Sequence, residues 1–224
     1  MERLIDILIS SIMVVLLSPL MIPIIVLLKC TGEGEIFFLQ KRVGIRGQSF
    51  NLYKFATMLK DSPNIGTGTI TTKDDPRILP IGKLLRKTKI NELPQLLNIL
   101  FGHMSFIGPR PLTEKNFRFY SHETQSEVIK IRPGLSGIGS IIFRNEEEIL
   151  SNELGGVNFY KNHIAPYKGS LERWYVLNKS LKNYFLLILV TIHAVLNPES
   201  KIVWKVFKNL PEPPEELKKT INYI

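Results

Sequence analysis

An uncharged apolar segment near the start of the chain limits its fold more than any other feature. From Ile7 to Leu28 the sequence runs for 22 residues without a charged side chain, and a straight membrane-spanning helix needs about 20 apolar residues. The segment Leu4–Leu28 therefore predicts attachment to a membrane. A cleaved signal peptide is disfavoured, because Glu2 and Asp6 interrupt the basic stretch that such a peptide requires and no small-x-small cleavage site follows.

Ser18 and Pro19, followed by Pro23, lie inside this apolar segment. Each proline removes a backbone donor and clashes with the preceding helical turn, so a helix here should bend. Two arrangements are therefore open from the pattern: a spanning helix, and a helix that dips into one leaflet and returns. The bias of basic residues towards the cytoplasm places the C-terminal side of the segment there. Arg3 precedes the segment, and the basic residues that follow it are Lys29, Lys41, Arg42 and Arg46.

The charge balance favours anionic partners. The chain has 29 Lys and Arg against 20 Asp and Glu, a net charge of +9, which suits nucleic acid, acidic lipid headgroups or phosphorylated substrates. We expect no nucleic acid, because the basic turns lack interleaved aromatic residues on which bases stack. The single Cys30 excludes an internal disulfide and a cysteine-based zinc site. The four histidines show no metal-ligand spacing.

The rest of the chain predicts an α+β fold that is mostly helical, in three parts: a membrane helix at 1–30, a domain at 31–208 and a tail at 209–224. Strands are predicted at Glu35–Gln40 and Phe50–Met58, and a loop rich in Gly, Thr and Asp at 61–75.

Two helices are predicted after this loop. The first, from Arg77, has one apolar and one basic face, which is typical of a solvated helix and also of one lying on acidic lipid. The second begins at Asn91, which is a good N-cap, has Pro94 in its first turn, and ends at Gly102.

The last third of the chain has further apolar stretches. Tyr184–Leu196 is strongly apolar but too short to span a bilayer, so we expect a core or interfacial helix there. Lys201–Leu210 mixes Trp and aliphatic residues with lysines, a composition that favours the membrane interface. Phospholipid of the inner leaflet is therefore an expected partner. The Pro- and Glu-rich segment from Pro211 predicts a loosely ordered tail.

Cationic residues on short turns, with one carboxylate at a predicted helix start, are the main candidates for chemistry. Arginine forks and lysine charges bind phosphate oxygens, and a carboxylate such as Glu92 can help to hold a divalent cation during phosphoryl transfer. Each arginine alone is more often a surface salt-bridge partner, and Glu92 alone more often a favourable first-turn charge. The cationic candidates are Arg42, Lys54, Arg77, Arg110, Arg132 and Arg144.

The stretch DDPRILPIGKLLRKTKINELPQLLNILFGHMSFIGPRPL, from Asp74 to Leu112, resembles the bacterial sugar transferase family, the monotopic phosphoglycosyl transferases. KRVG (41–44), YKFATM (53–58), IRPGLSG (131–137) and LERWYVLNKSL (171–181) extend the likeness to almost the whole chain. The resemblance implies transfer of a sugar-1-phosphate from a UDP-sugar to polyprenol (undecaprenyl) phosphate, with release of UMP and a requirement for Mg²⁺. It also implies an N-terminal helix broken at Ser18 and Pro19 that re-enters the leaflet, and a catalytic domain on the cytoplasmic face of the bacterial inner membrane.

The resemblance also implies roles for individual residues. In the family an Asp-Glu pair precedes Leu-Pro-Gln-Leu; the Asp attacks the donor phosphate and the Glu, here Glu92, helps to bind the metal. The motifs that gather phosphate and nucleotide contain Lys54, Arg77, Arg110 and Arg132, and Arg144 is a further candidate for phosphate binding.

Position 91 departs from the family pattern, because the nucleophilic Asp is replaced by Asn91. An amide is a far poorer nucleophile than a carboxylate, so the covalent route cannot be carried over. Three explanations stay open: Glu92 acts as nucleophile, or as base and metal ligand for direct attack by the lipid phosphate; the chain is a catalytically silent membrane scaffold; or Asn91 is an inactivating replacement or converts to Asp. We favour a working transferase. Ala56 and His103 also differ from the common family residues. The sequence fixes neither the sugar nor the oligomeric state, for which a homodimer would be unsurprising.

Overall fold

The computed structural model describes residues 1–66, 71, 75–152, 156–221 and 223. Within them the chain is mostly helical, with two small sheets, as the sequence predicted. The strands are β1 (Phe37–Val43), β2 (Ser49–Phe55), β3 (Ser105–Ile107) and β4 (Gly134–Ser136). The helices of the first half are α1 (Glu2–Cys30), α2 (Pro80–Lys87), a 3-10 turn at Ile90–Glu92, and α3 (Gln95–Leu100). Those of the second half are α4 (Glu114–Phe117), α5 (His122–Val128), α6 (Ile138–Ile142), α7 (Glu146–Asn152), α8 (Gly156–Phe159), a π-helical turn (Tyr160–Ile164), α9 (Ala165–Leu177), α10 (Leu181–Leu196), α11 (Ile202–Val206) and α12 (Glu215–Lys218).

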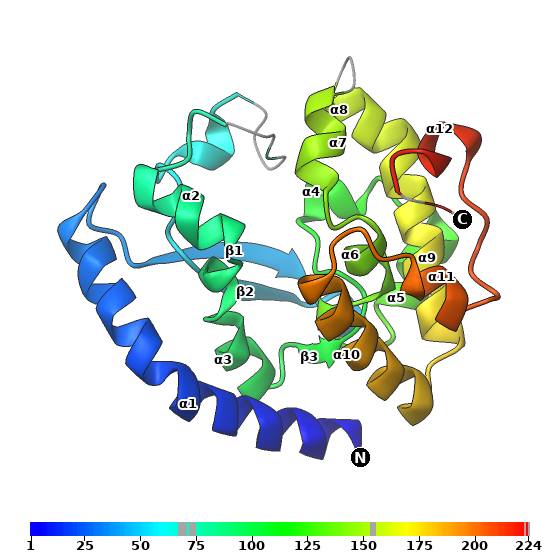
Figure 1. Ribbon diagram of the computed structural model, residues 1–224, viewed down its shortest axis with the longest axis horizontal. Coiled ribbons are helices and arrows are strands. Elements are labelled where there is room, and N and C mark those ends of the chain that lie inside the picture. The colour runs from blue at the N-terminus through cyan, green and yellow to red at the C-terminus, as the bar shows by residue number, and fades with distance from the viewer. Residues whose placement is uncertain (67–70, 72–74, 153–155, 222, 224) are drawn as a thin grey trace.

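The helix α1 is continuous across Ser18 and Pro19, and Figure 1 shows it curving along one side of the molecule. It is long and apolar enough to cross a membrane, and most of its apolar side chains are exposed. That exposure is what a helix in contact with lipid requires, because a water-soluble fold would bury these side chains. The predicted re-entry at Ser18 and Pro19 stays a prediction.

Both ends of α1 contact the rest of the protein. At its start, Asp6 is buried and accepts hydrogen bonds from the Tyr184 hydroxyl (2.7 Å), the Ser105 hydroxyl (3.1 Å) and the Phe106 backbone N–H (3.1 Å). At its other end, Leu28 packs in a cluster with residues of β2 and α2. The helix is therefore attached to the domain at both ends, not only through the chain that follows it.

Two charged residues in the first turn of α1 add to this attachment. Arg3 donates to the carbonyls of Ile99 (2.5 Å) and Leu100 (2.7 Å), which lie at the C-terminal end of α3. Cations are favoured there because the last carbonyls of a helix lack partners and carry partial negative charge. Glu2 forms an ion pair with Lys179 (2.7 Å).

The two sheets are small, and each consists of two strands. β1 and β2 form an antiparallel hairpin, in which Lys41 lies opposite Asn51. β3 and β4 are parallel, with Ser105 paired to Gly134, and α4 and α5 form the crossover between them. The basic residues of the KRVG motif were expected in a turn, but they lie within β1, because the hairpin extends three residues further than the apolar pattern indicated.

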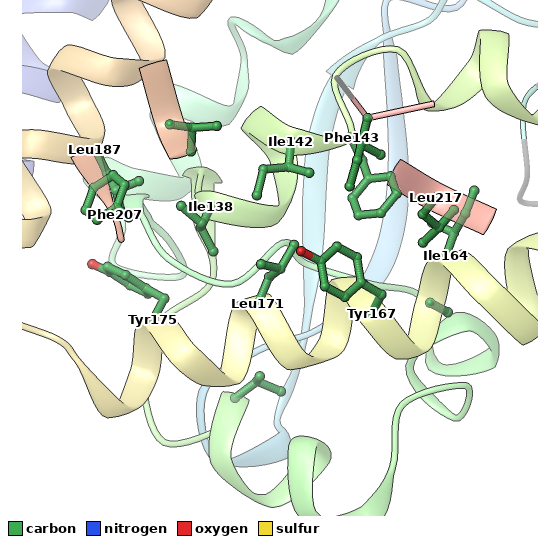
Figure 2. Packing of buried hydrophobic residues seen from close by; sticks show 14 of the residues in the cluster. Ile138, Ile142, Phe143, Ile164, Tyr167, Leu171, Tyr175, Leu187, Phe207 and Leu217 are labelled. Atoms are coloured by element: carbon green, nitrogen blue, oxygen red, sulfur yellow. The ribbon is translucent and has the colours of Figure 1, made fainter. Parts of the chain in front are cut away.

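The main hydrophobic core surrounds α9. Figure 2 shows Tyr167, Leu171 and Tyr175 on α9 facing Ile138 and Ile142 of α6. Apolar residues of α10, α11 and α12 close this core, including the fully buried Leu187 and Leu217.

Three local predictions have clear outcomes. Gly102 follows α3 with φ 87°, so the predicted end of this helix is confirmed. Asn91 is not an N-cap: it lies in the 3-10 turn, and α3 begins only after Pro94, because Pro94 has no N–H with which to continue the hydrogen bonding of that turn. The described part of the tail is not loosely ordered, since Leu217 of α12 and Ile221 after it pack into the core. Part of the predicted loop at 61–75, and residues 222 and 224, lie outside the described residues.

The predicted apolar helix Tyr184–Leu196 lies within α10. Tyr184, Leu187 and Val190 are buried, whereas Leu189 and Ile192 are exposed. One face thus completes the core, and the opposite face is apolar and open. Such a face is consistent with the expected membrane interface.

Candidate active site

An open cleft of about 190 Å³ lies between the β1–β2 hairpin with α2 on one side and α7 to α9 on the other. Six basic and three acidic side chains line it, so its described lining carries a charge excess of three positive. The basic ones are Arg42, Lys54, Arg86, Lys89, Arg110 and Lys168, and the acidic ones Glu92, Glu146 and Glu147. A partly enclosed cleft with this excess favours a polyanionic ligand.

Lys54 and Glu92 form the central ion pair of the cleft. Lys54 lies in β2, and its Nζ is 2.8 Å from Glu92 Oε1. Each of the two side chains is only 20% exposed. Burial alone would raise the pKa of Glu92, but Lys54 and Arg110 reverse this and hold it below its usual range. Burial lowers the pKa of Lys54 to about 8, while Glu92 favours its charged form. At neutral pH Glu92 is therefore ionised.

Arg42 and Arg110 add two further charges beside this pair. Arg42 points from β1 into the cleft and donates to the Pro111 carbonyl (3.0 Å) and to Gln40. Burial, and then the like charge of Arg110, lower the pKa of Arg42 to about 10, which still leaves it charged. Burial opposes the charge of Arg110, but Glu92 raises its pKa. Three cations thus surround one carboxylate, and an anionic ligand would relieve their mutual repulsion.

Asn91 is held next to Glu92 by the 3-10 turn, which starts after Lys89 in the left-handed conformation (φ 59°). Asn91 as a whole is 5% exposed, and it lines the cleft. Among the described residues its Oδ1 has no hydrogen-bond partner. A buried acceptor left unpaired costs about 1–3 kcal/mol, so this oxygen is suited to contact a ligand.

Three predicted phosphate-binding arginines lie outside the cleft lining. Arg77 is buried and paired with Asp75 (2.5 Å), and it donates to the carbonyls of Ser62 (2.7 Å) and Ile65 (2.9 Å). Since Ser62 lines the cleft, Arg77 shapes the cleft wall from behind.

Arg132 and Arg144 contact backbone carbonyls elsewhere. Arg132 donates from Nε to Gly102 (2.8 Å), and Arg144 donates to Ala194 and Val195 near the C-terminal end of α10. The phosphate-binding roles predicted for Arg77, Arg132 and Arg144 stay predictions.

The sequence already named Arg42 as a cationic candidate, but it gave no role to three other residues of the cleft lining. These are Glu146, Tyr160 and Lys168, which reach the cleft through the packing of α7, the π-helical turn and α9. Tyr160 begins a π-helical turn, a local feature often found at functional sites. Of the family departures, Ala56 is buried and His103 stacks on Phe50.

The site offers few protein ligands for a metal. No group of three or more His, Cys, Asp or Glu side chains that could hold a metal occurs in the part of the chain that the structure describes. Magnesium, however, commonly takes only one or two protein oxygens and completes its shell with water and substrate phosphates. Ionised Glu92 and the unpaired Oδ1 of Asn91 fit that need.

Comparison with known proteins identifies the family. The sequence model of the family described as "Bacterial sugar transferase" matches residues 1–198. The protein therefore belongs to the bacterial sugar transferase family, as its motifs predicted. It is 34% identical over 208 residues to the exopolysaccharide production protein ExoY of Sinorhizobium fredii, covering 87% of this chain and 84% of that one. It is 31% identical to the uncharacterized sugar transferase EpsL of Bacillus subtilis, covering 89% of each.

Longer relatives carry names that state a reaction. The chain is 37% identical over 142 residues to a UDP-glucose:undecaprenyl-phosphate glucose-1-phosphate transferase of Klebsiella pneumoniae. That match covers 62% of this chain and 30% of the relative. The relatives of this kind therefore support transferase activity, and the substrates of this chain are a matter for proposal.

Proposed function

We propose that this protein transfers a sugar-1-phosphate from a UDP-sugar to polyprenol phosphate at the cytoplasmic face of the bacterial inner membrane, releasing UMP. The observation that carries this proposal is the cleft in which Arg42, Lys54 and Arg110 surround Glu92. Names of relatives that act on UDP-sugars and undecaprenyl phosphate support the substrate classes. This reaction would be a first membrane step of glycan assembly.

Donor binding would rest on the three cations. The diphosphate of a UDP-sugar carries two negative charges, which match the excess of Arg42, Lys54 and Arg110 over Glu92. Arginine forks can each take two phosphate oxygens, so Arg42 and Arg110 would also fix the orientation of the donor. Holding the donor in one orientation is a large part of the catalysis of phosphoryl transfer.

Direct attack by the lipid phosphate suits the side chains present. An oxygen of polyprenol phosphate attacks the sugar-bearing phosphorus, and the bond from that phosphorus to the oxygen shared with the UMP moiety breaks. UMP leaves with the electron pair of that bond, and the product is a sugar diphosphate of the lipid. The attacking oxygen is already anionic, so no base is needed. This fits Glu92, whose lowered pKa makes it a weak base, and Asn91, which cannot supply a carboxylate.

Magnesium would be held by Glu92 and the Asn91 amide oxygen together with substrate oxygens. When bound, it supplies neutralisation of charge on the phosphate oxygens. Lys54 then keeps Glu92 in place through their ion pair.

A second candidate function is a catalytically silent membrane scaffold of the same fold. Asn91 at the position of the family nucleophile favours it. One assay separates the two candidates: UMP release by purified protein in nanodiscs, with polyprenol phosphate, magnesium and a panel of UDP-sugars. The parent chain is compared with Asn91→Asp and Glu92→Gln.

We expect the parent to release UMP and Glu92→Gln to lose this activity. If the parent is inactive and Asn91→Asp gains turnover, the scaffold function is correct and the transferase proposal fails. Full activity in Glu92→Gln would mean that the site lies elsewhere.

For the membrane helix we propose a re-entrant arrangement, with both ends of α1 on the cytoplasmic side. A straight helix of 29 residues is about 44 Å long, enough to put its two ends on opposite sides of a bilayer. Here Arg3 and Asp6 contact the same domain into which Cys30 leads. Contacts at both ends with one domain support a helix that returns to the side from which it entered.

Cysteine labelling in intact cells tests this arrangement. In a Cys30→Ser background, a single cysteine at Glu2 is compared with one at Glu199, an exposed residue of the domain. We expect a membrane-impermeant reagent to label neither position in intact cells and both after permeabilisation. Labelling of position 2 alone in intact cells would establish a spanning helix.

A further inference from the structure

A buried glutamate lies on the far side of the turn that presents Arg110. Glu172 belongs to α9 and has no solvent-exposed surface. Its Oε1 accepts a hydrogen bond from the backbone N–H of Arg110 (3.2 Å). The turn Gly108–Pro111 thus presents the Arg110 side chain to the cleft, while the Arg110 backbone N–H is bonded to a buried carboxyl group.

The same turn rests on the glycine-rich segment 134–139. Gly108 donates to the Ser136 carbonyl (3.0 Å), and Gly134 donates to the Pro109 carbonyl (2.9 Å). A Cβ at Gly134 would lie 2.1 Å from the Gly108 nitrogen, so only glycine allows this approach of the two chains. These backbone bonds fix Gly108 and Pro109, and Glu172 supplies the bond to the next residue, Arg110.

The glycine segment also encloses the carboxyl group itself. A Cβ at Gly139 would come 2.6 Å from Glu172 Oε1, and one at Gly137 3.6 Å from Oε2. A side chain at position 139 would therefore collide with the carboxyl group of Glu172. The sequence pattern alone gave these glycines no role, and this packing explains them.

We propose that Glu172 is a positioning residue, which holds the Arg110 turn so that the Arg110 guanidinium meets the donor diphosphate. This role rests on the proposed function, because the position of Arg110 matters only if the cleft binds a diphosphate.

The surroundings of Glu172 favour its protonated form more than water does. Burial raises its pKa to about 7, against the backbone bond from Arg110 and the charges of Lys168 and Arg110. Lys168 is paired with Glu146 instead. Among the described residues, Glu172 Oε2 and the hydroxyls of Tyr120 and Tyr175 have no hydrogen-bond partner. Buried polar groups are rarely left unpaired without a functional reason.

A double-mutant cycle on UDP binding tests this role in the full-length protein in nanodiscs. The variants are Glu172→Ala, Arg110→Ala and the two combined, with Glu199→Gln as an exposed control. Loss of one buried hydrogen-bond partner predicts about tenfold weaker UDP binding for Glu172→Ala. Because Glu172 acts through Arg110, the combined variant should bind UDP like Arg110→Ala alone.

Two conservative variants separate positioning from a general loss of stability. Glu172→Gln keeps an acceptor oxygen and should bind UDP within about threefold of the parent, whereas Glu172→Asp withdraws its oxygens by one methylene and should bind about tenfold more weakly. Glu172→Asp replaces Glu172→Ala in the cycle if the latter does not fold. In turnover, the KM for the donor should rise more than kcat falls.

Additive effects in the cycle, or UDP binding by both Glu172→Ala and Glu172→Asp within about twofold of the parent, would overturn the role of Glu172. Failure of the proposed function looks different: a parent that binds UDP but releases no UMP leaves the cycle measurable. A parent that does not bind UDP overturns both.

Discussion

Glu92, which is partly buried, and Glu172, which is fully buried, both lie near Arg110, and the charges around them differ. Glu92 lies 2.8 Å from Lys54 and near two arginines, and these charges lower its pKa despite burial. Glu172 lacks an ion-pair partner among the described residues and its pKa rises to about 7. The difference teaches that burial alone does not set ionisation; a cation within ion-pair distance does. Glu92 is kept charged and can contact a ligand, whereas Glu172 accepts a hydrogen bond from the backbone of Arg110.

Among the variants that test the difference between the two glutamates, removal of the Glu92 charge should have the largest effect. Glu92→Gln should lower kcat/KM for UMP release about 1000-fold, or ~4 kcal/mol, because a buried charge in the cleft is lost. Steady-state UMP release measures the effect, with Glu199→Gln as a matched exposed control. A loss below about tenfold would remove Glu92 from the chemistry.

The pH dependence of stability should differ in sign between the two glutamates. Glu172 has a pKa of about 7 when folded and 4.5 as its ordinary value. Its stabilising contribution is therefore complete below about pH 4.5 and is lost as pH rises through 7, a change on the order of 3 kcal/mol. Glu92, with a lowered pKa, instead contributes above its ordinary value of 4.5 and loses that contribution as pH falls.

Thermal unfolding of Glu172→Gln and of the parent at about pH 5 and about pH 8 measures this change. The unfolding temperature of the variant, relative to the parent, should be higher at the alkaline pH. A difference that is equal at both pH values would show that Glu172 titrates normally.

Loss of the partner of Glu92 should have a smaller effect. Lys54→Met leaves the Glu92 charge partly buried and unpaired, which we expect to lower the free energy of unfolding by about 2 kcal/mol after allowance for solvent screening. The double variant Lys54→Met with Glu92→Gln should recover most of this stability in denaturant unfolding. If the double variant is no more stable than Lys54→Met, the pair is not the cause.

Arg144 gives the smallest expected effect and a contrast to the cations of the cleft. Arg144→Ala removes donors to the carbonyls at the end of α10, which should cost about 1 kcal/mol of stability. We expect UDP binding within about twofold of the parent in calorimetric titration. Donor binding weakened about tenfold would instead support the phosphate-binding role that the sequence predicted for Arg144.

Local sequence patterns predicted several helices and strands correctly. The apolar segment, the first two strands, the basic helix and the end of α3 at Gly102 follow from composition and from residues with particular backbone preferences. The pairing of Arg77 with Asp75 also had a local signal, an acidic residue two positions earlier.

The contacts that build the candidate site depend on long-range packing, which local patterns do not predict. Lys54 and Glu92 are 38 residues apart, and Arg110 and Glu172 are 62 apart. Nothing in the residues near Glu172 indicates that its carboxyl faces inward to a backbone amide. The fold packs α9 against the Arg110 turn. Only this packing explains why residues 134, 137 and 139 are glycines, since a Cβ there would meet the turn or Glu172.

The attachment of α1 at both ends has a mechanical consequence. Because Arg3 and Asp6 fix its start, and Leu28 packs its end against β2 and α2, the helix cannot roll or slide without moving the domain. Any lateral pressure on its exposed apolar side is therefore transmitted to the whole molecule as a rigid tilt. In the membrane arrangement that we propose, a change in bilayer thickness would thus tilt the cleft relative to the bilayer without changing the shape of the cleft.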